Sequence, residues 1–221
     1  MKLKYSDWKS ITINVYDKLQ KKIKEVELGD DKNINALNQN IAILSVLCDV
    51  DEDTIASLSL DEFTALATQT NFLKDIPKVK IENKYKINGN DYEVWLDIQN
   101  MNMAQYIDFQ TLYKKPDENL KQIIACFLLP KGKKYGDGYD IVKVVNEIGE
   151  HLSIVDARSI MFFFVLAFQN LTKVTLSCLE KQMKREMKRE KDREKVNKMK
   201  MAITQIQRAA SLVENGDGFL L

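Results

Sequence analysis

The spacing of apolar residues changes in the middle of this chain, and this change constrains the fold more than any other feature. Before residue 77, apolar side chains recur every three or four positions, which is typical of amphipathic helices. From Val79 to Ile98 they alternate with polar residues on both sides of Asn88-Gly89, a dipeptide that readily forms a tight hairpin turn. Helical spacing then resumes. The sequence therefore predicts a mainly α protein with one β-hairpin, in the α+β class.

A two-residue turn at Asn88-Gly89 determines which residues of the two strands face each other. The predicted pairs, counted outward from the turn, are Ile87 with Asn90, Tyr85 with Tyr92, Asn83 with Val94, Ile81 with Leu96 and Val79 with Ile98. All apolar partners then share one face, because a slip of one residue would turn every side chain over. Since an isolated hairpin is marginal in water, this face must pack on helices or join a sheet from another chain.

Polar residues indicate where several helices begin. Thr12 precedes the first apolar stripe, Asp51 or Asp53 precedes a single turn, and Ser59 with Glu62 forms a capping box. Further helices are expected over residues 103–114, from Pro116 to the stop at Pro130, over 140–149, and from Ile154 onward. The predicted organisation is a short-helix unit at 1–77, the hairpin at 78–100, a helical core at 101–180, and a basic helical extension with a short tail at 181–221.

Composition argues against an ordinary enzyme. The chain has 33 Lys and Arg against 32 Asp and Glu, so bulk charge does not favour wrapping nucleic acid. One histidine, His151, and three scattered cysteines offer little for a metal site or a nucleophile–base pair. We therefore expect no catalytic residue, cofactor or metal, and expect the cysteines to be reduced, buried thiols in a cytosol.

Two further features resemble a calcium-binding loop and a membrane-spanning helix, but each has a simpler interpretation. Asp49, Asp51 and Asp53 begin like a calcium loop, but Thr54 and Leu60 stand where the loop needs Gly and Glu, so a capped helix start is expected. The longest apolar run, 160–168, has nine residues, whereas a bilayer span needs about 20. The sequence thus predicts a core helix there and no membrane span.

The region from Lys181 to Lys200 carries ten basic residues against four acidic ones, a net charge of +6. The rest of the chain carries about −5, so the molecule is electrically polarised. No Gly or Pro occurs between Gly149 and Gly216, which predicts one continuous helix through most of the extension. Twenty such residues would project roughly 30 Å beyond the body.

Three interpretations of this extension remain open. It is a solvated helical face; or its distal apolar stripe binds a partner helix or a neighbouring copy of the chain; or its basic residues contact nucleic acid. The stripe consists of Val196, Met199, Ile203 and Ile206. The candidate nucleic-acid contacts are Lys184, Arg185, Lys188 and Arg189. Interspersed acids and the lack of interleaved aromatic residues argue against nucleic acid as a partner.

The succession of apolar blocks resembles that of tail assembly chaperones and related small morphogenesis proteins of tailed bacteriophages. The blocks that carry the resemblance are Trp8–Thr12, Ile43–Leu47, Leu58–Phe63, Asn71–Leu73, Gln105–Asp108, Ala125–Pro130 and Phe162–Phe164. They lie between Trp8 and Leu179, so the extension after Leu179 departs from the pattern.

The resemblance implies a non-enzymatic protein that binds an aggregation-prone tape-measure protein in the host cytoplasm and is absent from finished particles. That family has no catalytic residues to carry over. The alternative is a structural virion subunit, such as a connector, ring or packaged protein. It would assemble, as a homo-oligomer or with neighbouring virion subunits, through the hairpin edge and the C-terminal helix.

Overall fold

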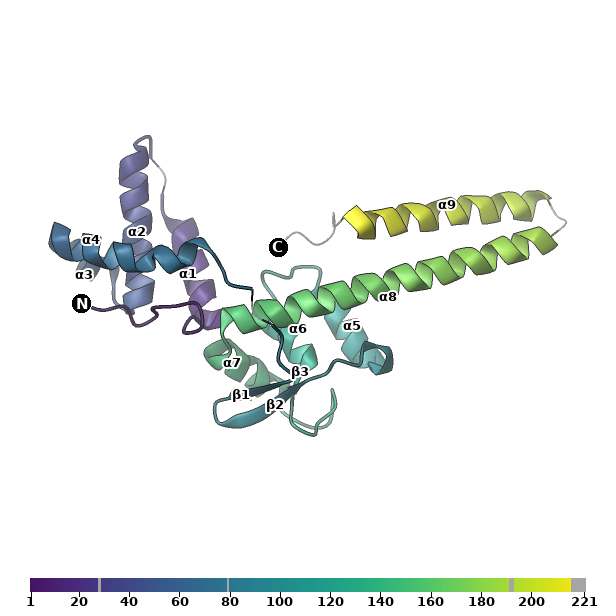
Figure 1. The fold of residues 1–221 in the computed structure, drawn as a ribbon, viewed down its shortest axis with the longest axis horizontal. Helices are drawn as coiled ribbons and strands as arrows, with labels where there is room; N and C mark the ends of the chain where they lie inside the picture. The colour runs from purple at the N-terminus through teal and green to yellow at the C-terminus, as the bar shows by residue number, and fades with distance from the viewer. Residues whose placement is uncertain (28, 79, 191–192, 216–221) are drawn as a thin grey trace. The chain divides into compact units, whose positions relative to one another are not determined.

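The computed structural model describes residues 1–27, 29–78, 80–190 and 193–215 (Figure 1). Helices account for most of these residues, and one small antiparallel sheet accompanies them, which confirms the predicted fold class. The chain divides into two compact units, Met1–Met161 (unit 1) and Phe162–Leu221 (unit 2). The division falls inside a helix, and each unit is described by itself below.

Unit 1 begins with the predicted short helices, and each starts at a polar cap. They are α1 (Ile13–Glu25), α2 (Lys32–Cys48), α3 (Glu52–Ala56) and α4 (Leu60–Gln69), followed by a 3-10 turn at Thr70–Lys74. Thr12, Asp51 and Ser59 cap α1, α3 and α4 as predicted, and the capping box of Ser59 with Glu62 is complete. A small core of Leu44, Ile55 and Leu66 packs α2, α3 and α4 together.

The hairpin has the predicted turn and register. Strands β1 (Lys84–Ile87) and β2 (Asn90–Val94) pair antiparallel, with Ile87 opposite Asn90 and Tyr85 opposite Tyr92. The pairing ends sooner than predicted. The amide of Val94 still donates to the carbonyl of Asn83 at 3.0 Å, but Leu96 is exposed and outside the strand, and residue 79 lies outside the described part of the chain.

A third strand, which the sequence analysis did not predict, explains why β2 leaves β1. Strand β3 (Leu128–Pro130) pairs antiparallel with β2, and the amide of Trp95 donates to the carbonyl of Phe127 at 2.7 Å. The helix expected to run from Pro116 to Pro130 is therefore shorter: α6 spans Leu120–Phe127, with turns before it. The apolar run at the end of α6 continues as buried strand, because an apolar run alone does not distinguish the two.

The remaining helices of unit 1 are a 3-10 turn at Ile98–Asn100, α5 (Met103–Leu112), α6, and α7 (Ile141–His151). Of these, α6 and α7 contact the sheet, and Figure 1 places α7 beside it. Helix α8 (Ile154–Arg189) begins at Ile154 as predicted, and the Ser153 hydroxyl caps it by accepting from the amide of Asp156 at 3.1 Å. The amide of Ile154 donates to the carbonyl of Ile11 at 2.8 Å, so the start of α8 is joined to the segment preceding α1.

The expectation of one continuous, projecting C-terminal helix is wrong. Helix α8 ends at Arg189, and a second helix, α9 (Arg193–Asn215), returns antiparallel beside it (Figure 1). Residues 191 and 192, which join the two helices, lie outside the described part of the chain. No Gly or Pro marks the reversal, so helix-breaking residues could not have predicted it.

One expectation about burial is wrong, and one property of α8 was not expected. Cys126 is buried, but Cys48 is only half-buried and Cys178 is exposed, so the three thiols are not all in a core. Among the described helices, α8 is also the one long and apolar enough to cross a membrane by length and composition alone. The count of nine residues missed this property because it stopped at the first polar residue, Gln169.

Candidate protein-binding surface

Helices α8 and α9 form an antiparallel hairpin, and both helices carry the residue spacing of a coiled-coil seam. On α8, successive half-buried residues of the distal part are separated alternately by four and three residues. The less exposed residues of α9 have the same spacing. The α8 positions are Gln169, Lys173, Leu176, Glu180, Met183, Met187 and Glu190. The described α9 positions are Val196, Met199 and Ile203. We call these two sets the seam of the hairpin.

Polar contacts fix the alignment of the two helices. The Gln207 amide on α9 donates to the Glu180 carboxylate at 2.9 Å, and Lys195 forms an ion pair with Glu190 at 4.0 Å. Hydrogen bonds from Lys184 and Gln207 lower the pKa of Glu180 from its ordinary value. A carboxylate at a seam position is therefore kept charged by partners on both helices.

The predicted partner-binding stripe of α9 thus has a partner within the same chain. Ile203 is only 8% exposed, and Val196 and Met199 are half-buried. The side chain of Ile206, the fourth residue of the stripe, lies outside the described part of the structure. In the structure the described residues of the stripe face α8 of the same chain, and their predicted binding to a separate partner stays a prediction.

The four candidate nucleic-acid contacts all lie on solvent-exposed positions of α8. Lys184 forms an ion pair with Glu180, and exposed Glu186 stands between Arg185 and Lys188. Nearby, Gln182 donates to Glu186 at 3.2 Å. The basic stripe is therefore interrupted by acids in three dimensions as well as in sequence, which weakens phosphate binding by an unopposed positive face.

Exposed apolar side chains lie along α8, and sequence reasoning did not single them out as a surface. Phe162 is 60% exposed and Val174 61% exposed, although a Phe or Val side chain favours burial. The large apolar residues of α8 that are exposed are Phe162, Leu166, Leu171, Val174 and Leu179. We call this set the α8 apolar surface. At 100° per residue they point to different sides of α8: Phe162 and Leu166 share one side, and Leu171 and Val174 lie toward the opposite one.

A second, smaller apolar face lies in unit 1 on α5. Met103, Tyr106 and Ile107 are spaced at i, i+3 and i+4 and are all exposed, whereas Gln105 and Phe109 on the opposite side are buried. The Gln105 amide donates to the carbonyl of Cys126 at 2.6 Å, which fixes the rotation of α5. Helix α5 therefore presents an apolar face outward from a fixed base.

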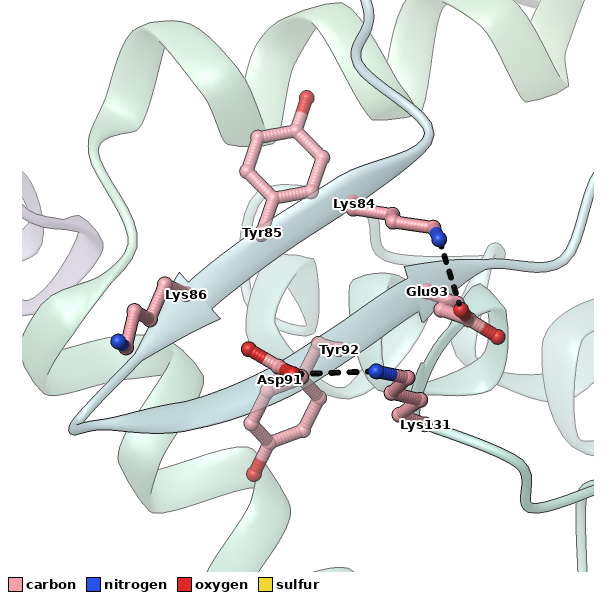
Figure 2. A pocket seen from close by; sticks show the side chains of 7 residues that line it. All are labelled: Lys84, Tyr85, Lys86, Asp91, Tyr92, Glu93 and Lys131. Atoms are coloured by element: carbon pink, nitrogen blue, oxygen red, sulfur yellow. Dashed lines mark hydrogen bonds and ion pairs between the residues drawn. The ribbon is translucent and has the colours of Figure 1, made fainter.

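A shallow hollow of about 210 Å³ lies against the sheet, and Figure 2 shows the seven side chains that line it. Lys84 forms an ion pair with Glu93 at 3.6 Å, and Lys131 forms one with Asp91 at 3.4 Å. The other lining residues are Tyr85, Lys86 and Tyr92. Because both ion pairs cross between chain segments of the sheet and are exposed, they support strand register and contribute little free energy.

The most strongly perturbed polar groups of unit 1 include two tyrosines with carboxylate partners, Tyr92, which is buried, and Tyr135, which is half-buried. The Tyr92 hydroxyl donates to Glu147 of α7, and burial followed by this bond raises the pKa of Tyr92. The Tyr135 hydroxyl donates to Asp108 at 2.7 Å, and its pKa is raised for the same reasons. Burial also raises the pKa of the Cys126 thiol to about 12. These groups are held in their neutral forms, which suits structural contacts between elements.

The segments that resembled metal or calcium sites have structural roles. Asp51 caps α3 by accepting from the amide of Thr54 at 2.6 Å, and Asp49 pairs with Lys4 and Lys18. His151 ends α7 and lies 3.8 Å from Glu150. Within the described ranges of the chain, no group of three or more His, Cys, Asp or Glu residues could hold a metal ion.

Comparisons with known proteins identify no relative of this chain. No family model matches the chain, and neither a curated protein nor a solved structure matches it.

Proposed function

We propose that this chain is a non-enzymatic morphogenesis protein of a tailed bacteriophage, a tail assembly chaperone that holds a tape-measure-like partner in the host cytoplasm. The single observation that best supports the proposal is the α8 apolar surface, where five large apolar side chains of one helix face solvent. A partner helix that would otherwise aggregate can bury its own apolar face against the side of α8 that carries Leu171 and Val174. The phage assignment itself comes from the resemblance in the order of apolar blocks.

The α5 face supplies a second contact of the same kind. Met103 is 71% exposed at the first position of α5, and Tyr106 and Ile107 continue its stripe. An extended partner with several apolar segments suits a protein that offers apolar faces on more than one element. Both faces have polar residues nearby, which is the usual composition of a binding surface in a chain that must also exist alone.

The proposal is tested by co-expressing the chain with the tape-measure protein of its own phage and measuring how much of that protein stays in the supernatant. We expect the wild-type chain to retain it. Val174→Lys combined with Leu171→Lys should abolish retention, because two charges would replace the apolar contact. Asn170→Lys, at an exposed polar position of the same stretch, is the matched control and should retain the partner. Equal retention by all three chains would contradict the proposal.

A structural virion subunit is the second candidate, and the position of β1 favours it. Strand β1 is at the edge of the three-stranded sheet, so its outer backbone groups can pair with a strand of a neighbouring copy. Mass spectrometry of purified particles separates the two functions. A chaperone is absent from particles, whereas a subunit is present at a fixed copy number relative to the tail proteins.

A vesicle experiment addresses the apolar character of α8 independently. If α8 binds protein partners, the purified chain should remain in the supernatant after incubation and sedimentation with phosphatidylcholine–phosphatidylglycerol vesicles. Co-sedimentation that survives high salt would instead favour insertion of α8 into the bilayer, because salt screens only the attraction of its basic residues to anionic lipid.

A further inference from the structure

Strand β1 forms one edge of the three-stranded sheet, and its register shows which backbone groups face outward. The amide of Val94 donates to the carbonyl of Asn83 at 3.0 Å, so these two residues form a hydrogen-bonded pair across the hairpin. Bonded and unbonded pairs alternate along antiparallel strands. Lys84 and Lys86 are therefore in unbonded pairs, and their N–H and C=O groups point away from β2.

These outward groups are available for pairing. Within the described ranges, no residue forms a hydrogen bond with the main chain of Lys84 or Lys86 on the outer side, and both residues are exposed. An unpaired strand edge is a template on which a further strand can form. The edge of β1 thus offers two residues that can donate to and accept from an added strand, as Tyr85 and Ile87 do toward β2.

The exposed face of the sheet carries charges that alternate from strand to strand (Figure 2). Lys131, which follows β3, forms an ion pair with Asp91 of β2 at 3.4 Å, and Asp91 is opposite Lys86 of β1. Farther from the hairpin turn, Glu93 of β2 forms an ion pair with Lys84 of β1 at 3.6 Å. The order from β3 toward the free edge is thus positive, negative, positive.

Lys86 is the cation of this series whose charge is not compensated. Its cross-strand neighbour Asp91 is engaged by Lys131, both through the ion pair and through the Lys131 amide, which donates to the Asp91 carbonyl at 2.9 Å. Lys86 forms no ion pair with any described residue, and Figure 2 shows its ammonium group directed away from Asp91. An anionic side chain on the outer side of β1 would continue the alternation of charge.

We propose that the free edge of β1 binds an extended acidic segment of another protein as a fourth, antiparallel strand. Two acidic side chains of that segment, separated by one residue, stand opposite Lys84 and Lys86 on the exposed face. The residue between them is apolar, because it lies on the face of the half-buried Tyr85. The ligand is thus a strand in which acidic and apolar residues alternate.

A second copy of β1 does not fit this edge. Antiparallel pairing of two Lys84–Ile87 strands through their outer groups would set lysine against lysine, and like charges directly opposite each other are unfavourable. The lysines that exclude this occupant favour an acidic one. The site includes no residue of the α8 apolar surface, so the inference goes beyond the proposed function and does not depend on it.

Binding of synthetic peptides to the full-length chain, measured by fluorescence anisotropy, tests the proposal. The probe is a labelled peptide in which glutamate alternates with valine, and we expect saturable binding that weakens as salt is added. A control peptide of the same composition has its glutamates grouped at one end, and we expect about tenfold weaker binding because only the alternating peptide matches the edge. Equal affinity for the two peptides would overturn the proposal, since binding would then follow charge alone.

A substitution at the edge locates the binding. Lys86→Gln should weaken binding of the alternating peptide about fivefold, because it removes the uncompensated charge. Lys133→Gln makes the same change in net charge on an exposed loop of unit 1 and should leave the affinity unchanged. Circular dichroism checks that both variants are folded. Equal affinities of the two variants would place the peptide elsewhere and overturn the proposal.

N-methylated peptides test pairing through the backbone and need no variant of the protein. In an antiparallel strand the amides of the glutamates opposite the lysines donate to β1, whereas the valine amides point away. Methylation of the glutamate amides should therefore abolish binding, and methylation of the valine amides should preserve it. Equal affinity of the two methylated peptides would overturn strand addition, and loss of binding with only the valine-methylated peptide would overturn the antiparallel direction.

Discussion

At the scale of single residues, a few buried polar groups join elements that are far apart in sequence. The indole of Trp8 donates to the carbonyls of Phe72 and Asp75 at 2.7 and 2.9 Å, and ties the segment before α1 to the turn after α4. Tyr92 on β2 donates to Glu147 on α7 in the same way. Each such bond adds modest free energy, but leaving its buried partner unsatisfied costs about 1–3 kcal/mol. These residues therefore specify the fold of unit 1 beyond their apolar contacts.

The tyrosines of unit 1 make its stability fall at high pH. Burial raises the pKa of Tyr113 to about 12, above the ordinary value near 10, and also raises that of Tyr92 and Tyr135. The folded state thus binds these protons more tightly than the unfolded state. The stabilisation is complete below pH 10 and is lost as the pH rises from 10 through 12.

Urea unfolding at a series of pH values measures this effect. We expect the urea concentration at the unfolding midpoint of the parent chain to decrease as the pH is raised from 10 to 12. The decrease should be smaller for Tyr113→Phe, because phenylalanine has no hydroxyl proton to lose. Tyr106→Phe, at an exposed position of α5, is the control and should follow the parent chain. If Tyr113→Phe keeps the full pH dependence, burial of this hydroxyl is not its cause.

At the scale of elements, local backbone chemistry sets the sheet and the helix starts, and side-chain seams join the helices. The turn between β1 and β2 has positive φ at both central residues, 48° at Asn88 and 78° at Gly89, which matches the twist of the paired strands. The hairpin of α8 and α9 depends instead on the seam, in which Ile203 is the described α9 residue with the deepest burial.

Replacing Gly89 by Ala should destabilise unit 1 by about 1–2 kcal/mol, because a side chain disfavours the left-handed region. The added methyl group meets no atom within 4 Å, so the loss would come from the backbone conformation alone. Gly29→Ala is the matched control, since its backbone has no positive φ and its nearest neighbour is 3.9 Å away. Comparable losses for both variants in urea unfolding would rule out the turn as the cause.

Ile203→Ala should reduce the free energy that holds α9 against α8 by about 2 kcal/mol, because it removes a buried side chain from the seam. Hydrogen exchange read by mass spectrometry on peptides of α9 measures this directly. A loss of that size makes exchange about 30-fold faster where α9 opens locally. Met201→Ala removes a side chain that is 67% exposed and should leave the exchange rate nearly unchanged. Equal rates in the two variants would mean that Ile203 does not hold the helices together.

At the scale of the whole molecule, charge is segregated between the units. Unit 2 contains 12 Lys and Arg against 7 Asp and Glu, so it is positive, whereas unit 1 is negative and the whole chain is close to neutral. Such segregation directs how a molecule approaches charged surfaces, even when its net charge is small. The exposed basic residues of α8 place this positive charge beside the α8 apolar surface.

The segregation of charge between the units predicts that the protein is retained on a cation-exchange resin at pH 7, although its formal net charge is only +1. Lys188→Glu with Arg189→Glu should lower the salt concentration needed for elution markedly. Lys133→Glu with Lys134→Glu makes the same change in net charge on an exposed loop of unit 1 and should lower it much less. If the two double variants elute together, net charge alone governs retention and the segregation has no effect on binding.

The sequence by itself determined the features that depend on residues close together in the chain. The caps at Thr12 and Ser59 act within three residues, and the Asn88-Gly89 turn sets a register that alternation then propagates. The heptad spacing of Val196, Met199 and Ile203 likewise indicated a helix contact from one helix alone. Such signals are readable because the physical interaction and its sequence pattern lie in the same short segment.

Only the tertiary structure decided the features that join distant segments. Strand β3 was not predictable because its three residues, Leu128–Pro130, become a strand through pairing with β2, about 35 residues earlier. The reversal between α8 and α9 has no glycine or proline signal, since contacts along the seam stabilise it. For the same reason the bond from Tyr92 to Glu147 and the exposure of the α8 apolar surface follow from packing, which no local pattern encodes.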